Sequence, residues 1–366
     1  NNRADAASFA GGSWVASGGV ALANLGTKDI GELARSSSAA VTSTRFRFDL
    51  GANRSLRAAG LFNDNLSTAA TVRQRLGRAV FDVDWASYIA EDRATFSGGA
   101  GGTRVTSVGL VAAATTPRIM YTPVTLAVLG LLTEEQLTNL LTYSEQFDNG
   151  AWSKARAAFT PNAATSPDGT VNADQWVEDS ATGVRTLFGN SVSYVSGTTY
   201  TFSIFAKPAA GVRYLQMYFG SSAFGNSNAA NAAVFDLNAG TRIMGASLIS
   251  ATITPVGNGW YRCSITKTAT VTIAATNYSL IALRNAYSID VATGYTGDST
   301  SGLYIWGAQL KPVAFMASYA PTTSAAVTQT ADSTTVTSTS FAGIHSATAG
   351  TLYAEFNVIQ ASGTRP

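Results

Sequence analysis

Hydrophobic and polar positions alternate along much of the chain, and strict alternation predicts β-strands rather than helices. In the segment 42–51, Phe46, Phe48 and Leu50 share one face of an extended chain, with charged residues on the other face. Period-2 or strand-like patterns recur at 56–65, 70–77, 198–208, 212–220, 232–243, 257–266, 278–284, 302–310 and 350–358. Almost no helical periodicity is present, so the sequence predicts an all-β fold of antiparallel β-sandwiches in tandem, with jelly-roll or Greek-key wiring.

Two stretches lack this pattern and are expected to be extended connections. The segment 92–125 is rich in Gly and Thr, and 320–340 is rich in Thr and Ser with Val as its only large apolar residue. The predicted organisation is a sandwich at 1–91, a connector at 92–141, a second sandwich at 142–319, a linker at 320–340 and the first strand of an incomplete domain at 341–366. Because that last strand pattern has only begun where the chain stops, we expect a piece of a longer protein.

The segment "GLLTEEQLTNLLTYSEQFDNGAW" (130–152) gathers carboxylates, amides and aromatic residues. Glu134 and Glu135 are adjacent, so their side chains diverge if the segment is extended. With Thr133 and Gln136 they also match a capping box, which opens a short helix. Either structural interpretation is favoured over catalysis, and the apolar residues are expected to pack where one sandwich meets the next.

Composition and charge narrow the class of protein. The chain has 366 residues, of which 46% are hydrophobic and 13% charged, which is unlike a disordered protein. The formal net charge is only +2 and no block of Lys and Arg occurs, so nucleic acid is not expected as a partner. No run of 18 apolar residues is present, so membrane insertion by a helix is not expected either.

Several kinds of catalytic and cofactor site are excluded by the scarcity of reactive side chains. Cys263 is the only cysteine and His345 the only histidine, so a metal site with several nitrogen and sulfur ligands cannot form within one subunit. A Ser-His-Asp triad would depend on His345 alone, and no G-x-S-x-G elbow is present. The "GGAGG" segment (98–102) does not continue as a nucleotide-binding loop. We therefore predict no catalytic residue, no metal and no cofactor.

Carboxylates and aromatic residues remain as candidates for contacts with sugars. Asp82 and Asp84 would share one side of a strand, where a solvated face is favoured over a cation or sugar contact. Aromatic rings stack on sugar rings, and most aromatics of the second sandwich are expected in its core. Tyr194, Phe224 and Tyr295 lie nearer turns and are the predicted carbohydrate-binding residues, facing a groove open to solvent.

Several motifs in collinear order resemble phage and prophage virion proteins. "RFRFDLG" and "AGLFNDNLSTAATVRQRLG" resemble a galactose-binding-like N-terminal module of fibre and tail proteins, although Asn63 stands where histidine is common. "GLLTEEQLTNLLTYSEQFDNGAW" looks like the segment that follows in that family. "YTFSIFAKP", "NGWYRCSIT" and "LYIWGAQLKP" resemble the carbohydrate-binding-module-like sandwich of head-spike and tail-fibre proteins. "GTLYAEF" resembles the opening strand of a concanavalin A-like or laminin-G-like domain.

The resemblance implies a non-enzymatic virion protein, a fibre or spike that presents glycan-binding sandwiches for attachment to a host surface. It implies docking of the N-terminal module to other virion proteins, a homotrimer, and host surface polysaccharide as a ligand. Two alternatives stay open: a purely structural head-decoration or tail-assembly protein without a ligand, and a polysaccharide depolymerase that uses carboxylates such as Asp82, Asp84 or Glu134.

Overall fold

The computed structural model describes residues 94–225, 229–276, 279–290 and 294–336, together with four short strands before them. The chain divides into two compact units, Asn1–Val80 and Phe81–Pro366. In the first unit, β1 (Ser8–Ala10) pairs antiparallel with β2 (Arg47–Asp49), and Phe9 lies opposite Phe48. This pairing confirms a strand around Phe48, while most of the predicted 1–91 sandwich lies outside the described residues.

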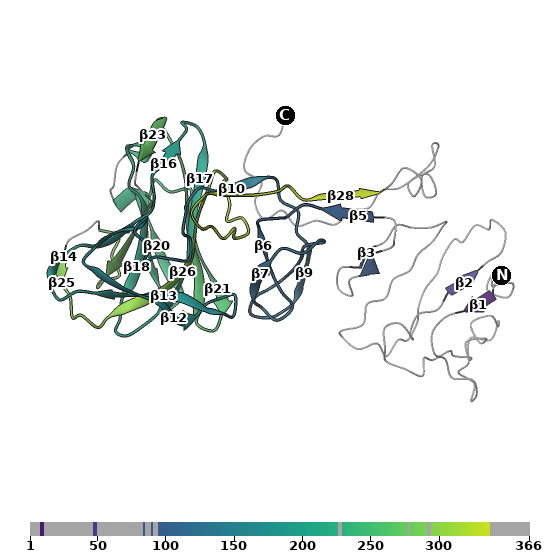
Figure 1. Cartoon of the computed structure of the whole chain (residues 1–366), viewed down its shortest axis with the longest axis horizontal. Helices are drawn as coiled ribbons and strands as arrows, with labels where there is room; N and C mark the ends of the chain where they lie inside the picture. Colours follow the sequence, from purple (N-terminus) through teal and green to yellow (C-terminus); the bar gives the residue numbers. More distant parts are fainter. Residues whose placement is uncertain are drawn as a thin grey trace. The chain divides into compact units, whose positions relative to one another are not determined.

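Two antiparallel sheets of six strands each form most of the second unit (Figure 1). The first sheet has the order β11 (Ser153–Ala155), β15 (Arg185–Phe188), β24 (Ser279–Arg284), β18 (Tyr214–Phe219), β19 (Ala232–Asp236) and β20 (Thr241–Met244). The second sheet has the order β12 (Ala157–Thr165), β13 (Val171–Glu178), β26 (Gly302–Lys311), β17 (Thr199–Pro208), β22 (Trp260–Thr268) and β21 (Ser250–Gly257). Neighbouring strands in the sheets are mostly distant in sequence, so crossovers connect them.

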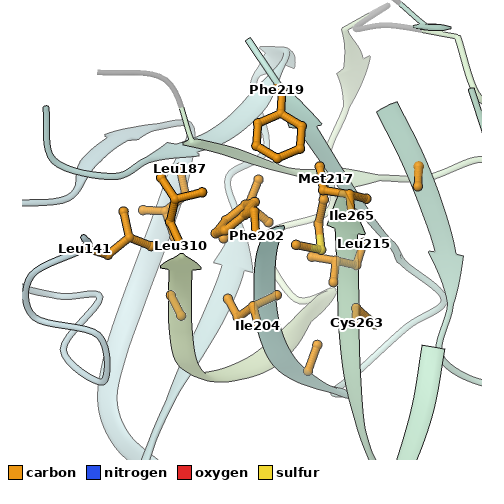
Figure 2. Close-up of a cluster of buried hydrophobic side chains, with 14 of the residues drawn as sticks. Leu141, Leu187, Phe202, Ile204, Leu215, Met217, Phe219, Cys263, Ile265 and Leu310 are labelled. Carbon is orange, nitrogen blue, oxygen red and sulfur yellow. The ribbon is translucent and has the colours of Figure 1, made fainter. Parts of the chain in front are cut away.

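The two sheets bury a shared hydrophobic core, which Figure 2 shows in close-up. Leu215 and Met217 on β18 alternate with residues that point the other way, as the period of a strand requires. Phe202 and Ile204 on β17 meet them from the second sheet. Each such side chain contributes about 1.5–3 kcal/mol when it is fully buried. The predicted two-sheet sandwich is therefore confirmed.

Every strand that the alternating pattern predicted between 198 and 310 is present. The segment 232–243 forms β19 and β20 around a turn, with Phe235 opposite Arg242. Cys263 on β22 is fully buried. Trp260 and Trp306 are also buried, 2% and 1% exposed, in line with the expectation that most aromatic residues of this sandwich lie in its core.

Short strand pairs occupy the connector before the sandwich, its exit and the loops of the sandwich itself. They are the hairpins β3 (Val83–Asp84) with β4 (Ile89–Ala90), β6 (Thr103–Val105) with β7 (Val111–Ala113) and β8 (Ile119–Tyr121) with β9 (Val128–Leu131). Further pairs are β10 (Leu137–Asn139) with β27 (Val327–Gln329), β5 (Ala94–Ser97) with β28 (Ser333–Val336), β14 (Thr182–Gly183) with β25 (Tyr295–Thr296), and β16 (Val192–Tyr194) with β23 (Ile273–Thr276). Two 3₁₀ turns, η3 (Ser222–Phe224) and η4 (Ala229–Asn231), complete the described elements.

The connector before the sandwich and the segment after it run side by side. Two antiparallel ladders join them: Leu137 lies opposite Gln329, and Phe96 lies opposite Thr334. The partners in these two pairs are 192 and 238 positions apart in sequence, so backbone pairing holds the segments before and after the sandwich together. The strand predicted at 350–358, and His345 with it, lie outside the described residues.

Candidate functional site

Two of the three predicted carbohydrate-binding residues lie in the core. Tyr194 is 0% exposed and Phe224 is 2% exposed, and their ring centroids are 4.9 Å apart. Both rings pack edge-on against Tyr200. The prediction that they face a solvent-open groove is wrong, because β16 and the 3₁₀ turn η3 direct both rings inward although each residue is close to a turn.

Tyr295 is half-buried, and its ring is occupied by arginines. The guanidinium carbon of Arg185 lies 4.0 Å from the ring centroid and that of Arg213 lies 5.6 Å from it. The Tyr295 hydroxyl donates to Glu178 at 2.5 Å, and Glu178 also pairs with Arg213. Burial, followed by the hydrogen bond to Glu178, raises the pKa of Tyr295. These contacts give Tyr295 a structural role in a cation–π and ion-pair cluster.

Glu134 is the centre of a buried polar network. Its Oε2 accepts from Arg118 Nη2 at 2.9 Å, Gln329 Nε2 at 2.8 Å and Ser318 Oγ at 2.5 Å. Its Oε1 accepts from the backbone N–H of Ser318 at 2.8 Å. Arg118 also pairs with Asp332 at 2.7 Å. Burial alone would raise the pKa of Glu134, but the hydrogen bonds from Ser318 and the charge of Arg118 outweigh it and lower that pKa.

The same network reaches the sandwich through Lys311, the last residue of β26. Its ammonium donates to the carbonyl of Ser318 at 2.8 Å and to Gln329 Oε1 at 3.2 Å. Glu134 is buried while Glu135 is exposed, which confirms the extended interpretation of this segment. The helical interpretation is wrong, since residues 132–136 are not helical and β10 follows them. Glu134 is thus fully engaged in joining the connector, the sandwich and the segment that follows β26 (312–336, the exit segment).

Asp84 lies in β3, opposite Ile89, and Asp82 lies outside the described residues. Among the parts of the chain that the structure describes, no group of three or more His, Cys, Asp or Glu side chains could hold a metal ion. Nor does that portion contain a helix long and apolar enough to cross a membrane.

A cavity of about 240 Å³ lies between the β6–β7 hairpin and the sandwich. The hairpin supplies one wall with small residues, and it is held in place by Thr103, whose hydroxyl donates to the carbonyl of Tyr319 at 2.8 Å. The opposite wall carries Trp306 from β26 and Tyr319 from the exit segment, whose ring centroids are 4.9 Å apart. A second hollow beside Arg118 measures only about 10 Å³, which is at most the space of one water molecule.

Two carboxylates line this cavity, Glu145 and Asp168. Glu145 follows β10 in the turn before β11, and Asp168 lies in the tight β12–β13 turn. Both accept from Asn172 Nδ2 at 3.3 Å, so the two accepting oxygens are no further apart than twice that distance. Glu145 also accepts from the Tyr319 hydroxyl at 3.0 Å.

The surroundings shift the pKa values of the two carboxylates in opposite directions. Burial, followed by the charge of Asp168, raises the pKa of Glu145 despite the hydrogen bond from Tyr319. Burial would also raise the pKa of Asp168, but hydrogen bonds from Ser166 at 2.6 Å and Thr170 at 2.7 Å outweigh it and lower that pKa. The negative charge of Asp168 is therefore stabilised locally, whereas that of Glu145 is not.

Two buried polar atoms near the cavity have no hydrogen-bond partner in the structure, but neither is presented to it. They are the indole Nε1–H of Trp306, a residue only 1% exposed, and Oδ1 of Asn172, which does not line the cavity. The cavity itself therefore presents the two carboxylates beside the aromatic residues Trp306 and Tyr319.

Sequence reasoning missed this site. Glu145 and Asp168 belong to two separate turns, and the fold of the β12–β13 turn brings them together. The one local signal is "SPDGT" (166–170), whose Asp-Gly pair is typical of a tight turn that fixes the carboxylate. Trp306 was expected in the core, where it lies, and its role as a wall of a cavity depends on the separate β6–β7 hairpin.

Comparison with known proteins gives no family. No protein-family profile matches the chain, and no curated protein matches it significantly. The enzymatically active domain of tailspike protein 4 of bacteriophage CBA120 aligns over 47% of this chain and 21% of its own, with 9% identity and a TM-score of 0.28. The CBM22-1 and GH10 modules of a Clostridium thermocellum N-terminal endo-1,4-β-D-xylanase 10B, complexed with xylohexaose, align over 50% and 30%, with 12% identity and a TM-score of 0.28. The chain spans less than a third of either structure, and likeness at this level establishes neither family nor function.

Proposed function

We propose that this chain belongs to a phage or phage-like virion, as a fibre or spike protein that binds a saccharide of the host surface in the cavity beside Glu145 and Asp168. The observation that carries the proposal is the pair of carboxylates beside aromatic residues in that cavity. Sugar hydroxyls can donate to the carboxylates of Glu145 and Asp168 while the sugar ring packs against the aromatic side of the cavity. The volume of about 240 Å³ is below the range of about 300–1,000 Å³ typical of pockets for drug-sized ligands, so it suits a small ligand such as one sugar ring.

The setting on a virion is supported by the sequence resemblance to phage fibre and spike proteins. In that setting the N-terminal module docks to other virion proteins, and three copies of the chain present three cavities. Individual sugar contacts are weak, and several linked sites raise the overall avidity by 10²–10⁴, as an order of magnitude. A small cavity with few hydrogen bonds is therefore sufficient for attachment.

A saccharide panel tested against the full chain examines the proposal. Ala113 lines the cavity from β7 and is exposed, so Ala113→Trp fills the cavity without disturbing the core. Ala239 in the β19–β20 turn is also exposed and does not line the cavity, which makes Ala239→Trp the matched control. We expect saturation-transfer NMR signals from at least one sugar, lost in Ala113→Trp and retained in Ala239→Trp. Equal binding by both variants would contradict the proposed site.

A purely structural role is the second candidate, and the Glu134 network favours it. That network fastens the connector and the exit segment to the sandwich with buried ion pairs, as a rigid spacer would require. The two candidates differ in one respect, namely saccharide binding. A chain that is present on the particle and binds no saccharide would be a spacer.

A further inference from the structure

Lys311 and Gln329 meet in the buried network that joins the sandwich to the exit segment. Lys311 ends β26 and Gln329 ends β27, and each residue is 0% exposed. Lys311 Nζ lies 3.2 Å from Gln329 Oε1. The C=O bond of the side-chain amide adds at most about 1.2 Å, so Nζ lies within about 4.4 Å of the carbonyl carbon Cδ. An amine nitrogen is thus held against a carboxamide carbonyl, away from solvent.

Lys311 has the surroundings of a nucleophile. Burial lowers its pKa to about 7, and the charges of Arg262 and Arg118 act in the same direction while that of Glu134 opposes them. A neutral amine, the form that attacks carbonyl groups, is therefore accessible near pH 7. Lys267, by contrast, donates to a backbone carbonyl and has no side-chain carboxamide as a partner among its hydrogen bonds in the described residues.

The nitrogen that a nucleophile would displace from Gln329 has a proton carrier beside it. Glu134 Oε2 accepts from Gln329 Nε2 at 2.8 Å, so the carboxylate touches that nitrogen. Ser318 Oγ lies 2.9 Å from Gln329 Oε1 and 2.5 Å from Glu134 Oε2. Its hydroxyl can therefore donate to negative charge that develops on Oε1. Burial also keeps water from hydrolysing the amide instead.

We propose that Lys311 Nζ and Gln329 Cδ join in an amide cross-link, with Glu134 as the proton carrier. Nζ supplies its lone pair to Cδ, and negative charge moves to Oε1. Glu134 takes one proton from Nζ and delivers it to Nε2. The Cδ–Nε2 bond breaks with its electron pair on Nε2, which leaves as ammonia, and the carbonyl forms again. The chain loses one ammonia molecule, and no oxidant or reductant is required.

The cross-link would fasten the exit segment to the last strand of the sandwich, whether or not the chain binds a saccharide. Since β27 pairs with β10, the same bond would also secure the connector. Cys263 is the only cysteine of the chain, so a disulfide within one chain cannot serve this purpose. A titratable amine at Lys311 exists only in the chain before this reaction, and Gln329→Met preserves that form.

Mass spectrometry of the purified, denatured chain tests the cross-link. The wild-type mass should lie below the mass of the sequence by one ammonia molecule. Chymotrypsin cuts after Phe315 and Tyr319, between the two residues, so the peptides that contain Lys311 and Gln329 should stay joined. Joined peptides distinguish the cross-link from ring closure at an Asn-Gly pair such as 149–150, which also releases ammonia.

Four substitutions separate the roles of the residues. Lys311→Arg and Gln329→Met should each keep the full mass. Glu134→Gln should slow the reaction by about 10²–10⁴-fold, the usual contribution of a positioned acid–base group. Lys267→Arg changes another buried lysine, one that donates to a backbone carbonyl, and should retain the mass loss. Tryptophan fluorescence unfolding shows whether each variant is folded.

The wild-type measurement decides the proposal without relying on any variant. A wild-type chain of full mass would overturn the cross-link, and so would a loss of ammonia without joined peptides. Joined peptides in Lys311→Arg would contradict the assignment of the nucleophile. Cross-linking of folded Glu134→Gln at the wild-type rate would contradict the role of Glu134.

Discussion

Replacement of Glu134 by glutamine should destabilise the sandwich strongly, whereas the same change at Glu135 should not. Glu134 Oε2 accepts three hydrogen bonds, from Arg118, Gln329 and Ser318. A glutamine can offer only one oxygen, so an NH₂ group would face donors on one side of the network. Arg118, 1% exposed, would then keep Asp332 as its only carboxylate.

Loss of one partner of a buried ion pair costs about 3–5 kcal/mol when the remaining charge is uncompensated, and because Asp332 still pairs with Arg118 the cost here should be near the lower end, about 3 kcal/mol. We therefore expect the free energy of unfolding to fall by about that amount in Glu134→Gln and to change by less than about 0.5 kcal/mol in Glu135→Gln. Urea unfolding followed by tryptophan fluorescence measures both. A change below about 1 kcal/mol in Glu134→Gln would refute the structural role of the network.

The acid side of the stability curve provides an independent check on Glu134. Its pKa is lowered in the folded protein from the ordinary value of 4.5. Its contribution to stability is therefore complete above that ordinary value and is lost as the pH falls through the lowered, folded value. The wild-type chain should lose more stability than Glu134→Gln over this acidic window, and parallel curves would contradict the assignment.

Three further predictions follow from buried polar groups and from the buried thiol. Burial lowers the pKa of the free Lys311 amine to about 7, so above that pH the unfolded chain binds more protons than the folded chain. The free energy of unfolding of the chain without the cross-link should therefore rise by up to about 1.4 kcal/mol per pH unit as the pH increases toward about 10. Urea unfolding of Lys311→Met should lack this slope, and equal slopes in the two proteins would refute the prediction. Asn139, 0% exposed, donates to Ala308 and Ala320 and accepts from Leu141 and Leu310, so Asn139→Ala should cost at least about 3 kcal/mol in the same assay. Burial raises the pKa of Cys263, so a thiol reagent should label it only after unfolding, and rapid labelling of the native chain would contradict this.

Strands were predictable from sequence because their signal is local. Phe202 and Ile204 recur with the period of a pleated strand, and that period does not depend on the rest of the fold. What alternation did not reveal is that the opposite face of β17 is covered as well. Thr201 is 4% exposed, and its hydroxyl donates to the carbonyl of Val313, in the segment that leaves the sandwich.

The site was not predictable in the same way, because it depends on contacts between distant segments. Tyr194 and Phe224 are close to turns, and proximity to a turn does not determine which way a ring points. Glu145 and Asp168 belong to separate turns, and the wall that encloses them comes from a hairpin in a segment expected to be an extended connector. The Glu134 network is equally nonlocal, since its partners Gln329 and Asp332 lie almost 200 residues further on.

The most direct test of saccharide binding observes the indole N–H of Trp306. The chain has six tryptophans, so six indole resonances are expected, and Trp306→Phe identifies the relevant one. Its N–H has no partner in the structure, whereas that of Trp260 donates to the carbonyl of Thr165 at 3.0 Å. Saturation with a saccharide that binds the chain should shift the Trp306 resonance, because Trp306 lines the cavity, and should leave that of Trp260 in place. An unshifted Trp306 resonance under a saccharide that demonstrably binds the chain would contradict the proposed site.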